Sequence, residues 1–140
     1  MIDRRCVLDS NVLMYHLNGV LNDELEKLLT DVLLSDPCVS VITRIEILGW
    51  RRHTAASLRH ATELLSCVNE QGLTTGIIEK CIQLRQNLAI KIPDALIAAT
   101  AIHLALPLMT ANQKDFEHVP DLTVWNRNPF GVSGPRRSSA

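Results

Sequence analysis

The stretch Arg4-Arg5-Cys6-Val7-Leu8-Asp9-Ser10-Asn11-Val12-Leu13 contains the pattern that organises the whole chain. Its first part, residues 4–8, is a short apolar run that predicts a β-strand. The apolar spacing of residues 11–17 predicts a helix, which Gly19 ends. Asp9 stands between the two. The stretch therefore predicts a strand that leads, through a carboxylate, directly into a helix.

The same alternation continues through the rest of the sequence. Further helices are expected at residues 22–34, 43–50, 55–68, 77–88 and 93–104, and further strands at residues 38–42, 72–74, 106–110 and 122–125. Because alternating strands and helices favour parallel pairing, we expect an α/β fold, a three-layer α/β/α sandwich with a mostly parallel central sheet. We expect residues 1–128 to form one domain, followed by a flexible C-terminal tail at residues 129–140, which are rich in Gly, Ser and Pro.

The composition indicates a soluble globular protein. Hydrophobic residues make up 46% of the 140 and charged residues 21%, which is ordinary for a chain that buries one core. The longest apolar stretch, residues 95–109, is interrupted by polar residues and is too short to cross a bilayer. No secretory signal pattern opens the sequence. The four cysteines form no C-x-x-C pair and have apolar neighbours, so we expect buried, reduced thiols in a cytoplasmic protein.

Four carboxylates stand at similar points along the chain, each where an apolar, strand-like run gives way to a helix or turn. They are Asp9, Glu46, Asp94 and Asp115. In a parallel sheet such exits lie at one edge, so these side chains are expected to converge. Converging carboxylates repel one another unless cations bind between them. Mg²⁺ and Mn²⁺ prefer oxygen ligands, and two such ions can hold a phosphodiester for attack by water.

Each carboxylate also has a purely structural explanation, because acidic residues are favoured at the starts of helices. The alternatives are a capping box at Thr43-Arg44-Ile45-Glu46, a first-turn charge at Asp94, a cap at Asn112-Gln113-Lys114-Asp115 and a cap by Asp9 itself. Independent caps have no reason to share one edge of a sheet. The four together therefore favour a site.

Other patterns are weaker. The five histidines form no H-x-x-x-H or H-E-x-x-H motif, so no zinc site is expected, and no G-x-S-x-G motif surrounds Ser10. The net charge of −1 is not that of a typical nucleic-acid-binding domain, so contact with a polyanion must be local or metal-mediated. The segment Trp50-Arg51-Arg52-His53 could stack a base and contact phosphates, or could be an ordinary solvated helix end.

Four segments resemble, in order, the motifs of PIN-domain ribonucleases, and in particular the VapC toxins of toxin–antitoxin pairs. The segments are residues 7–13, residues 40–46, residues 92–101 and residues 108–116, and the similarity extends over about residues 4–125. One segment alone is a weak signal, whereas four in the correct order are specific. The resemblance implies the PIN fold.

The resemblance also implies an activity, namely Mg²⁺- or Mn²⁺-dependent endoribonuclease. By matching segments, Asp9, Glu46, Asp94 and Asp115 would be both catalytic and metal-binding, with Asn11, Thr110 and Asn112 supporting them. Ser10 stands where the family commonly has Thr, which keeps a hydroxyl. A metal-activated water would attack phosphorus and leave a 5′-phosphate and a 3′-hydroxyl. The implied partners are RNA, a small antitoxin whose tail enters the acidic site, and a second copy in a homodimer.

Two alternatives remain open. The first is a PIN-like domain that binds RNA or protein without cleaving, although such domains usually lose the acidic set. The second is a phosphatase of the haloacid-dehalogenase type, whose first motif residues 7–12 superficially resemble. There Asn11 stands at the position of the general acid, and a neutral amide cannot donate that proton effectively.

Overall fold

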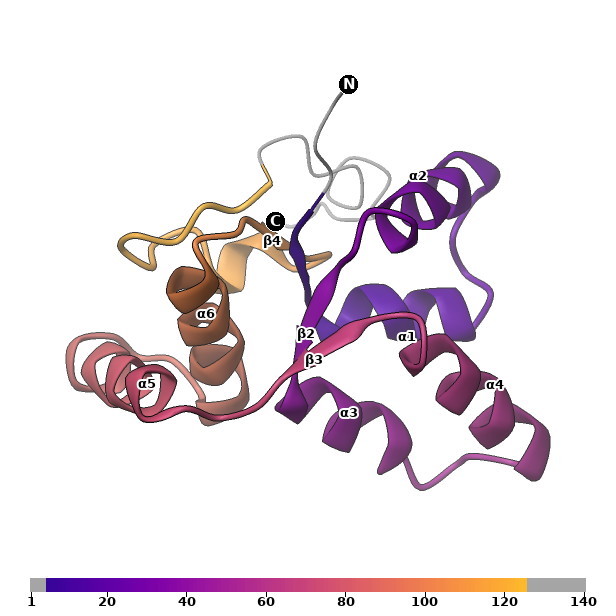
Figure 1. Cartoon of the computed structure of the whole chain (residues 1–140), viewed down its shortest axis with the longest axis horizontal. Helices are drawn as coiled ribbons and strands as arrows, with labels where there is room; N and C mark the ends of the chain where they lie inside the picture. Colours follow the sequence, from indigo (N-terminus) through magenta and orange to yellow (C-terminus); the bar gives the residue numbers. More distant parts are fainter. Residues whose placement is uncertain (1–4, 126–140) are drawn as a thin grey trace.

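The computed structural model describes residues 5–125, and these form a four-stranded parallel sheet flanked by helices (Figure 1). The strands are β1 (Val7–Leu8), β2 (Cys38–Ser40), β3 (Asn69–Gln71) and β4 (Leu108–Met109), in the order β3-β2-β1-β4. The helices are α1 (Ser10–Leu17), α2 (Asp23–Leu33), α3 (Val41–Leu48), α4 (Ala55–Leu65), α5 (Thr75–Asn87) and α6 (Ile92–Leu104), with a 3₁₀ turn η1 (Gln113–Asp115). The expected tail at residues 129–140, and the boundary before it, lie outside the described residues.

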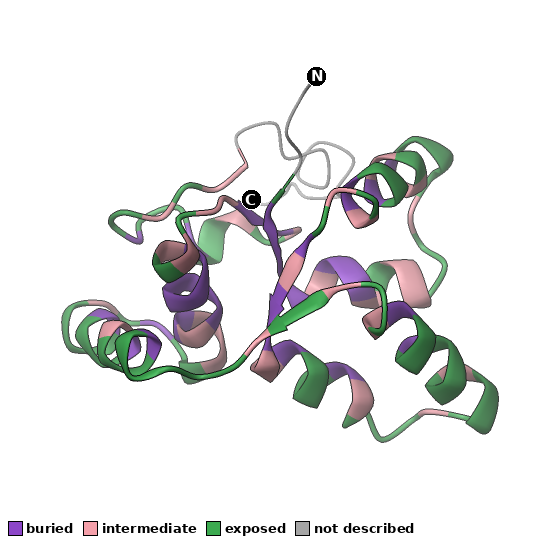
Figure 2. Cartoon of the chain, viewed as in Figure 1, coloured by how far each residue is buried: buried purple, intermediate pink, exposed green. Residues whose placement is uncertain are grey.

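The helices lie in two layers, which confirms the expected three-layer α/β/α arrangement. In Figure 1, α1, α2 and α4 lie on one side of the sheet and α5 and α6 on the other. The two residues of β1 pack on opposite sides of the sheet. Leu8 belongs to the hydrophobic core beneath α1, α2 and α4, and Val7 belongs to the core beneath α5 and α6. Both residues of β1 are buried, and the buried residues of α6 lie in its middle, at positions 95 and 97–101, where Figure 2 shows purple.

Helix α3 lies at the carboxyl edge of the sheet, where it contacts α1, α4 and α6. It begins at Val41 because the Ser40 side chain accepts a hydrogen bond from the N–H of Ile42 and caps the helix. The expected strand at residues 38–42 is therefore two residues too long. The expected helix start at Thr43 is wrong for the same reason.

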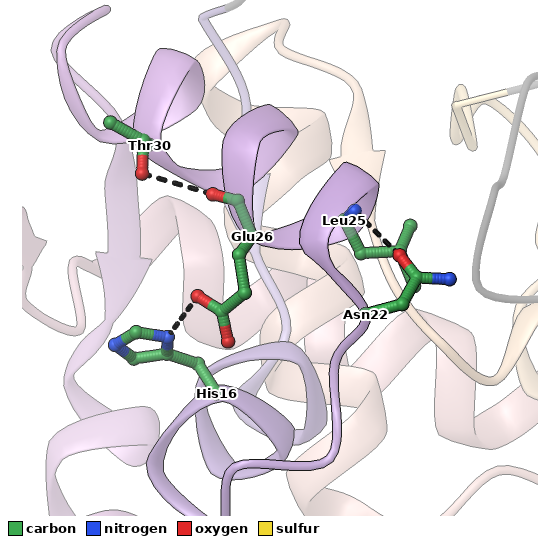
Figure 3. Close-up of polar contacts among 5 residues, drawn as sticks. All are labelled: His16, Asn22, Leu25, Glu26 and Thr30. Carbon is green, nitrogen blue, oxygen red and sulfur yellow. Dashed lines mark hydrogen bonds and ion pairs between the residues drawn. The ribbon is translucent and has the colours of Figure 1, made fainter.

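A hydrogen bond between side chains joins α1 to α2, and Figure 3 shows it together with the capping bond that starts α2. Gly19 adopts φ +69°, a left-handed conformation that ends the α1 segment. The Asn22 side chain accepts the Leu25 N–H at 2.9 Å and starts α2. His16 Nδ1 donates to Glu26 Oε1 at 2.7 Å, which ties the two helices together. The predicted helix at residues 22–34 is confirmed to within one residue at each end.

The two weakest predicted strands differ from the structure. Residues 72–74 form a loop, and the strand lies three residues earlier, as β3. Its polar residues suit an edge strand that pairs with β2 alone. At residues 122–125 only one bridge forms, between Leu108 and Val124. No helix within residues 5–125 is long and apolar enough to cross a membrane.

The four cysteines are free thiols with different environments. Cys6 and Cys81 are buried and Cys38 is partly buried, broadly as expected. Cys67 is exposed, contrary to the expectation, because it follows the end of α4 at Ser66 and lies beyond the packed face of that helix.

Candidate functional site

The four carboxylates come together at the carboxyl edge of the sheet, and they come from four different elements. Asp9 follows β1, Glu46 lies in the second turn of α3, Asp94 lies in the first turn of α6, and Asp115 ends η1. The charges of Asp94 and Glu46 raise the pKa of Asp9, and those of Asp115 and Glu46 raise the pKa of Asp94. The side chains therefore lie within electrostatic range of one another.

The route by which Asp94 reaches this edge differs from the expectation. The residues before it connect α5 to α6 and contain no strand. Asp94 is brought to the site by α6, which packs along the sheet and contacts β1, β2 and α3. Its position therefore depends on helix packing and not on the end of a strand.

Asp9 is the most buried of the four, with 5% of its surface exposed. Its pKa is raised from 3.8 to about 6, chiefly because burial disfavours the charged form and also because Asp94 and Glu46 carry like charges. Thr110 opposes this shift, because its hydroxyl donates to Asp9 Oδ2 at 2.7 Å. The Asp9 side chain makes no capping hydrogen bond to α1, so the expected capping alternative is wrong for this residue.

Glu46 is held by the hydroxyl of Ser10, which also contacts the hydroxyl of Thr43. Ser10 Oγ lies 2.6 Å from Glu46 Oε1 and 3.0 Å from Thr43 Oγ1. Since a hydroxyl carries one hydrogen, Ser10 donates to the carboxylate and accepts from Thr43. Thr43 is buried inside α3 and does not cap it, so the capping-box explanation of Glu46 is wrong. The three-residue spacing of Thr43 and Glu46 instead places both on one helix face.

Asp115 is fixed by a hydrogen bond from Asn112, whose Nδ2 lies 2.6 Å from Asp115 Oδ2. The Asn112 side chain makes no capping bond to η1, which removes the capping alternative here too. The backbone N–H of Asn112 donates to Thr110 Oγ1 at 3.0 Å. Thr110 therefore links the buried Asp9 to the segment that carries Asp115.

Asn11 contacts the loop that follows β4. Its Oδ1 accepts the backbone N–H of Ala111 at 3.1 Å, so it ties the start of α1 to the loop after β4. This contact positions the segment around Thr110, through which Asn11 acts on Asp9 indirectly. Because the side chain accepts at this contact, nothing here suits the acid role that a dehalogenase-type phosphatase would need.

Asp94 and Asp115 open into a pocket of about 220 Å³ beside the start of α6. Burial raises the pKa of the half-buried Asp94, as do Asp115 and Glu46, while Lys91 lowers it. The pocket is lined by Ala89, Ile90, Lys91, Asp94, Lys114, Asp115 and His118. Its charged walls distinguish it from the apolar core on either side of the sheet.

The segment Trp50–His53, for which RNA contact was expected, lies apart from this pocket. It forms the loop between α3 and α4, and Trp50 and His53 line a different, smaller cavity. Both ring nitrogens of His53 are engaged, one with Ile47 O and the other with Ser57 Oγ, each at 2.8 Å. Arg51 and Arg52 are exposed. An RNA contact at the two arginines stays a prediction.

The donor chemistry of the four carboxylates fits a hard divalent cation, because all of their ligand atoms are oxygens. A buried carboxylate with a raised pKa, such as Asp9, ionises more readily when a cation binds nearby. In the present arrangement of residues 5–125, no three His, Cys, Asp or Glu side chains are close enough to hold one ion. An ion held by one or two of these carboxylates and by water would need no third direct protein ligand.

Comparisons with known proteins agree with this fold. The model of the PIN domain matches residues 6–122. A toxin–antitoxin complex from Klebsiella pneumoniae contains a chain of 28% identity, with a TM-score of 0.69 over 85% of this chain and 96% of that one. Comparison with curated proteins gave no match.

Two further solved structures are similar in fold. They are DNA-bound VapBC from Salmonella typhimurium, with 23% identity and a TM-score of 0.75, and FitAcB from Neisseria gonorrhoeae, with 24% identity and a TM-score of 0.72. In each case 86% of this chain and 96% of the other chain are covered.

Proposed function

This chain belongs to the PIN domain family, and on that basis we propose that it is a Mg²⁺- or Mn²⁺-dependent endoribonuclease, the toxin of a toxin–antitoxin pair. One observation carries the proposal. Four carboxylates from four elements share one edge of the sheet, and for three of them the structural alternative of helix capping fails. Helix capping does not explain this arrangement, and repulsion between the carboxylates disfavours their charged forms. Such an arrangement is expected of a site that binds cations.

In the proposed site Asp9, Asp94 and Asp115 would hold the principal ion, directly or through water, and Glu46 would contribute to a second or transient ion. A bound ion would supply positive charge for the phosphate and lower the pKa of the attacking water. The chain's own hydrogen bonds prepare its ligands. Thr110 holds the rotamer of Asp9, Ser10 holds Glu46 and Asn112 holds Asp115. These bonds reduce the reorganisation that ligand binding costs.

The substrate and partners follow from the family and from its solved members. The Klebsiella pneumoniae chain, at 28% identity, was solved in a toxin–antitoxin complex. We therefore propose RNA as substrate, a small antitoxin as partner and a homodimer as the assembly. The rival is a PIN domain that binds RNA or protein without cleaving it, and the complete acidic set argues against that rival.

The activity is tested by incubating end-labelled RNA with the protein in Mg²⁺, in Mn²⁺ and in EDTA. We expect cleavage with either metal, none in EDTA, and products with a 5′-phosphate and a 3′-hydroxyl. Products with a 2′,3′-cyclic phosphate, or equal cleavage in EDTA, would overturn the metal-dependent mechanism. Binding without cleavage in any metal would favour the rival.

The toxin role needs a separate test in cells. Induced expression in a bacterial host should arrest growth, and expression of Glu46→Gln to the same level should not. Growth arrest by both proteins would separate toxicity from the acidic site. If the wild-type chain does not arrest growth, the proposed toxin role is refuted, whereas the proposed ribonuclease activity is not.

A further inference from the structure

The acidic pocket also contains cationic side chains. Lys91, Lys114 and His118 line it together with Asp94 and Asp115. Lys91 precedes α6, and Lys114 and His118 lie within and just after η1. All three are exposed, so their polar ends can meet a molecule that enters from solvent.

A polyanionic substrate needs such groups, because it must approach four carboxylates on a chain with a net charge of −1. Lys91 lowers the pKa of Asp94, which shows that its ammonium group lies within electrostatic range of that carboxylate. Its side chain makes no capping hydrogen bond to α6. Lys91 therefore has no evident role in starting the helix that it precedes.

Other basic residues of the described chain lie outside this pocket. Arg44 pairs with Glu70 on β3, and Lys80 lies 3.8 Å from Asp121. Arg85 donates to the backbone carbonyl of Ile90 at 2.7 Å. The exposed pair Arg51 and Arg52 lies in the loop between α3 and α4. Lys91 and Lys114 line the pocket together with Asp94 and Asp115, so they are placed to guide a phosphate towards those carboxylates.

We propose that Lys91 and Lys114 bind an RNA phosphate adjacent to the scissile one, with His118 as a third contact in the same pocket. The inference rests on the proposed ribonuclease function and assigns the substrate-positioning side of that site. The lysines act by charge and hydrogen bonding to phosphate oxygens, and so set the register of the strand without reading its bases. The competing explanation is that they only offset the charge of the two aspartates.

The test compares Lys91→Ala/Lys114→Ala, the lysine variant, with Lys27→Ala/Arg59→Ala, the control variant. Each removes two exposed positive charges, and Lys27 and Arg59 lie on α2 and α4, outside the pocket. Both are made in the Glu46→Gln background, and a short fluorescent single-stranded RNA is titrated in Mg²⁺ at several salt concentrations. Since each phosphate contact to single-stranded RNA contributes about 0.7 to the salt slope, loss of the one phosphate contact in the lysine variant should flatten the slope by about 0.7. The control variant should leave the slope unchanged.

Three outcomes would overturn the inference. An unchanged salt slope in the lysine variant is the first, and flattening by the control variant alone is the second. The third is a change in the Mn²⁺ concentration that stabilises the protein, with no change in RNA binding, because the lysines would then only offset the aspartates. RNA that fails to bind the Glu46→Gln protein at any salt concentration would overturn both proposals.

The two proposals can fail independently. A wild-type chain that never cleaves RNA, but whose lysine variant flattens the slope, would refute the nuclease and keep the phosphate contact. A chain that cleaves RNA with an unaltered slope in the lysine variant would do the reverse. In the cleaving wild-type background, the lysine variant should raise KM while leaving kcat within about threefold, because the contacts act on substrate binding.

Discussion

At the scale of single residues, ionisation of the buried Asp9 lowers the stability of the fold and supplies a charged ligand to the proposed site. Between about pH 4 and pH 6 the unfolded chain has lost the Asp9 proton and the folded chain keeps it, because the folded pKa is about 6. The free energy of unfolding therefore falls as pH rises through this range. A pKa shift of about two units corresponds to about 3 kcal/mol. The free energy of unfolding is therefore lower by that amount above about pH 6 than below about pH 4.

We expect Asp9→Asn to raise the free energy of unfolding at pH 7.5 by up to about 3 kcal/mol and to abolish cleavage. The amide removes the buried charge but can still accept from Thr110. At pH 4 the two proteins should be equally stable. Urea unfolding at both pH values measures this, and a variant that is less stable than wild type at pH 7.5 would contradict it.

Ser10 contributes through the position of Glu46. Ser10→Ala removes the donor to Glu46 and leaves the buried Thr43 hydroxyl without this partner, so cleavage should fall by roughly 10- to 100-fold. Ser10→Thr keeps a hydroxyl and should restore most of the activity. Initial rates per folded molecule test the pair. Equal rates for Ser10→Ala and wild type would remove this hydroxyl from the site.

At the scale of elements, β1 supports the site because it carries Asp9 at its end and lies between β2 and β4. Leu8→Ala should destabilise the protein by about 2–5 kcal/mol, since Leu8 is fully buried. Leu34→Ala is the matched control at a side chain that is 82% exposed, with an expected effect within about 0.5 kcal/mol. Chemical denaturation compares the two, and similar losses would contradict the assigned core.

The elements also show where prediction from sequence succeeds. Helix α2 has a capping asparagine and an apolar stripe, so local signals agree and its limits are found. Helix α3 follows an apolar run, Cys38–Ile42, that has no break, and only the Ser40 cap in three dimensions shows where the strand ends. The polar edge strand β3 has no apolar signal at all.

The site residues also differ in how far the sequence predicts their positions. Asp9 and Asp115 could be predicted because they follow strands whose order fixes where they meet. Asp94 follows a loop between helices, so its place depends on how α6 packs. The contacts of Ser10 with Thr43 and Glu46 join α1 to α3 across more than 30 positions, and no local pattern contains them.

At the scale of the whole molecule, metal binding and stability should be linked through protons. Below pH 6 an ion must displace the Asp9 proton, so binding is weaker there. We expect millimolar Mn²⁺ to raise Tm by several degrees at pH 7.5 and by clearly less at pH 5.0. Thermal melts in Mn²⁺ and in EDTA measure this. A larger increase at pH 5.0 would contradict the assigned site.

The central claim is that the four carboxylates act as one catalytic unit, and Asp94→Asn tests it most directly. Asp94 is the one acid whose structural explanation survives, because it lies in the first turn of α6. Asp23→Asn is the matched control, since Asp23 lies in the first turn of α2, on the exposed surface. The measurement is the rate of RNA cleavage per folded molecule in Mn²⁺.

We predict that Asp94→Asn lowers this rate by roughly two orders of magnitude or more while the protein stays folded. Asp23→Asn should cleave as fast as wild type. If the two variants behave alike, with small losses of stability and unchanged cleavage, then Asp94 is only a favourable charge at the start of a helix and the acidic site is not a catalytic unit.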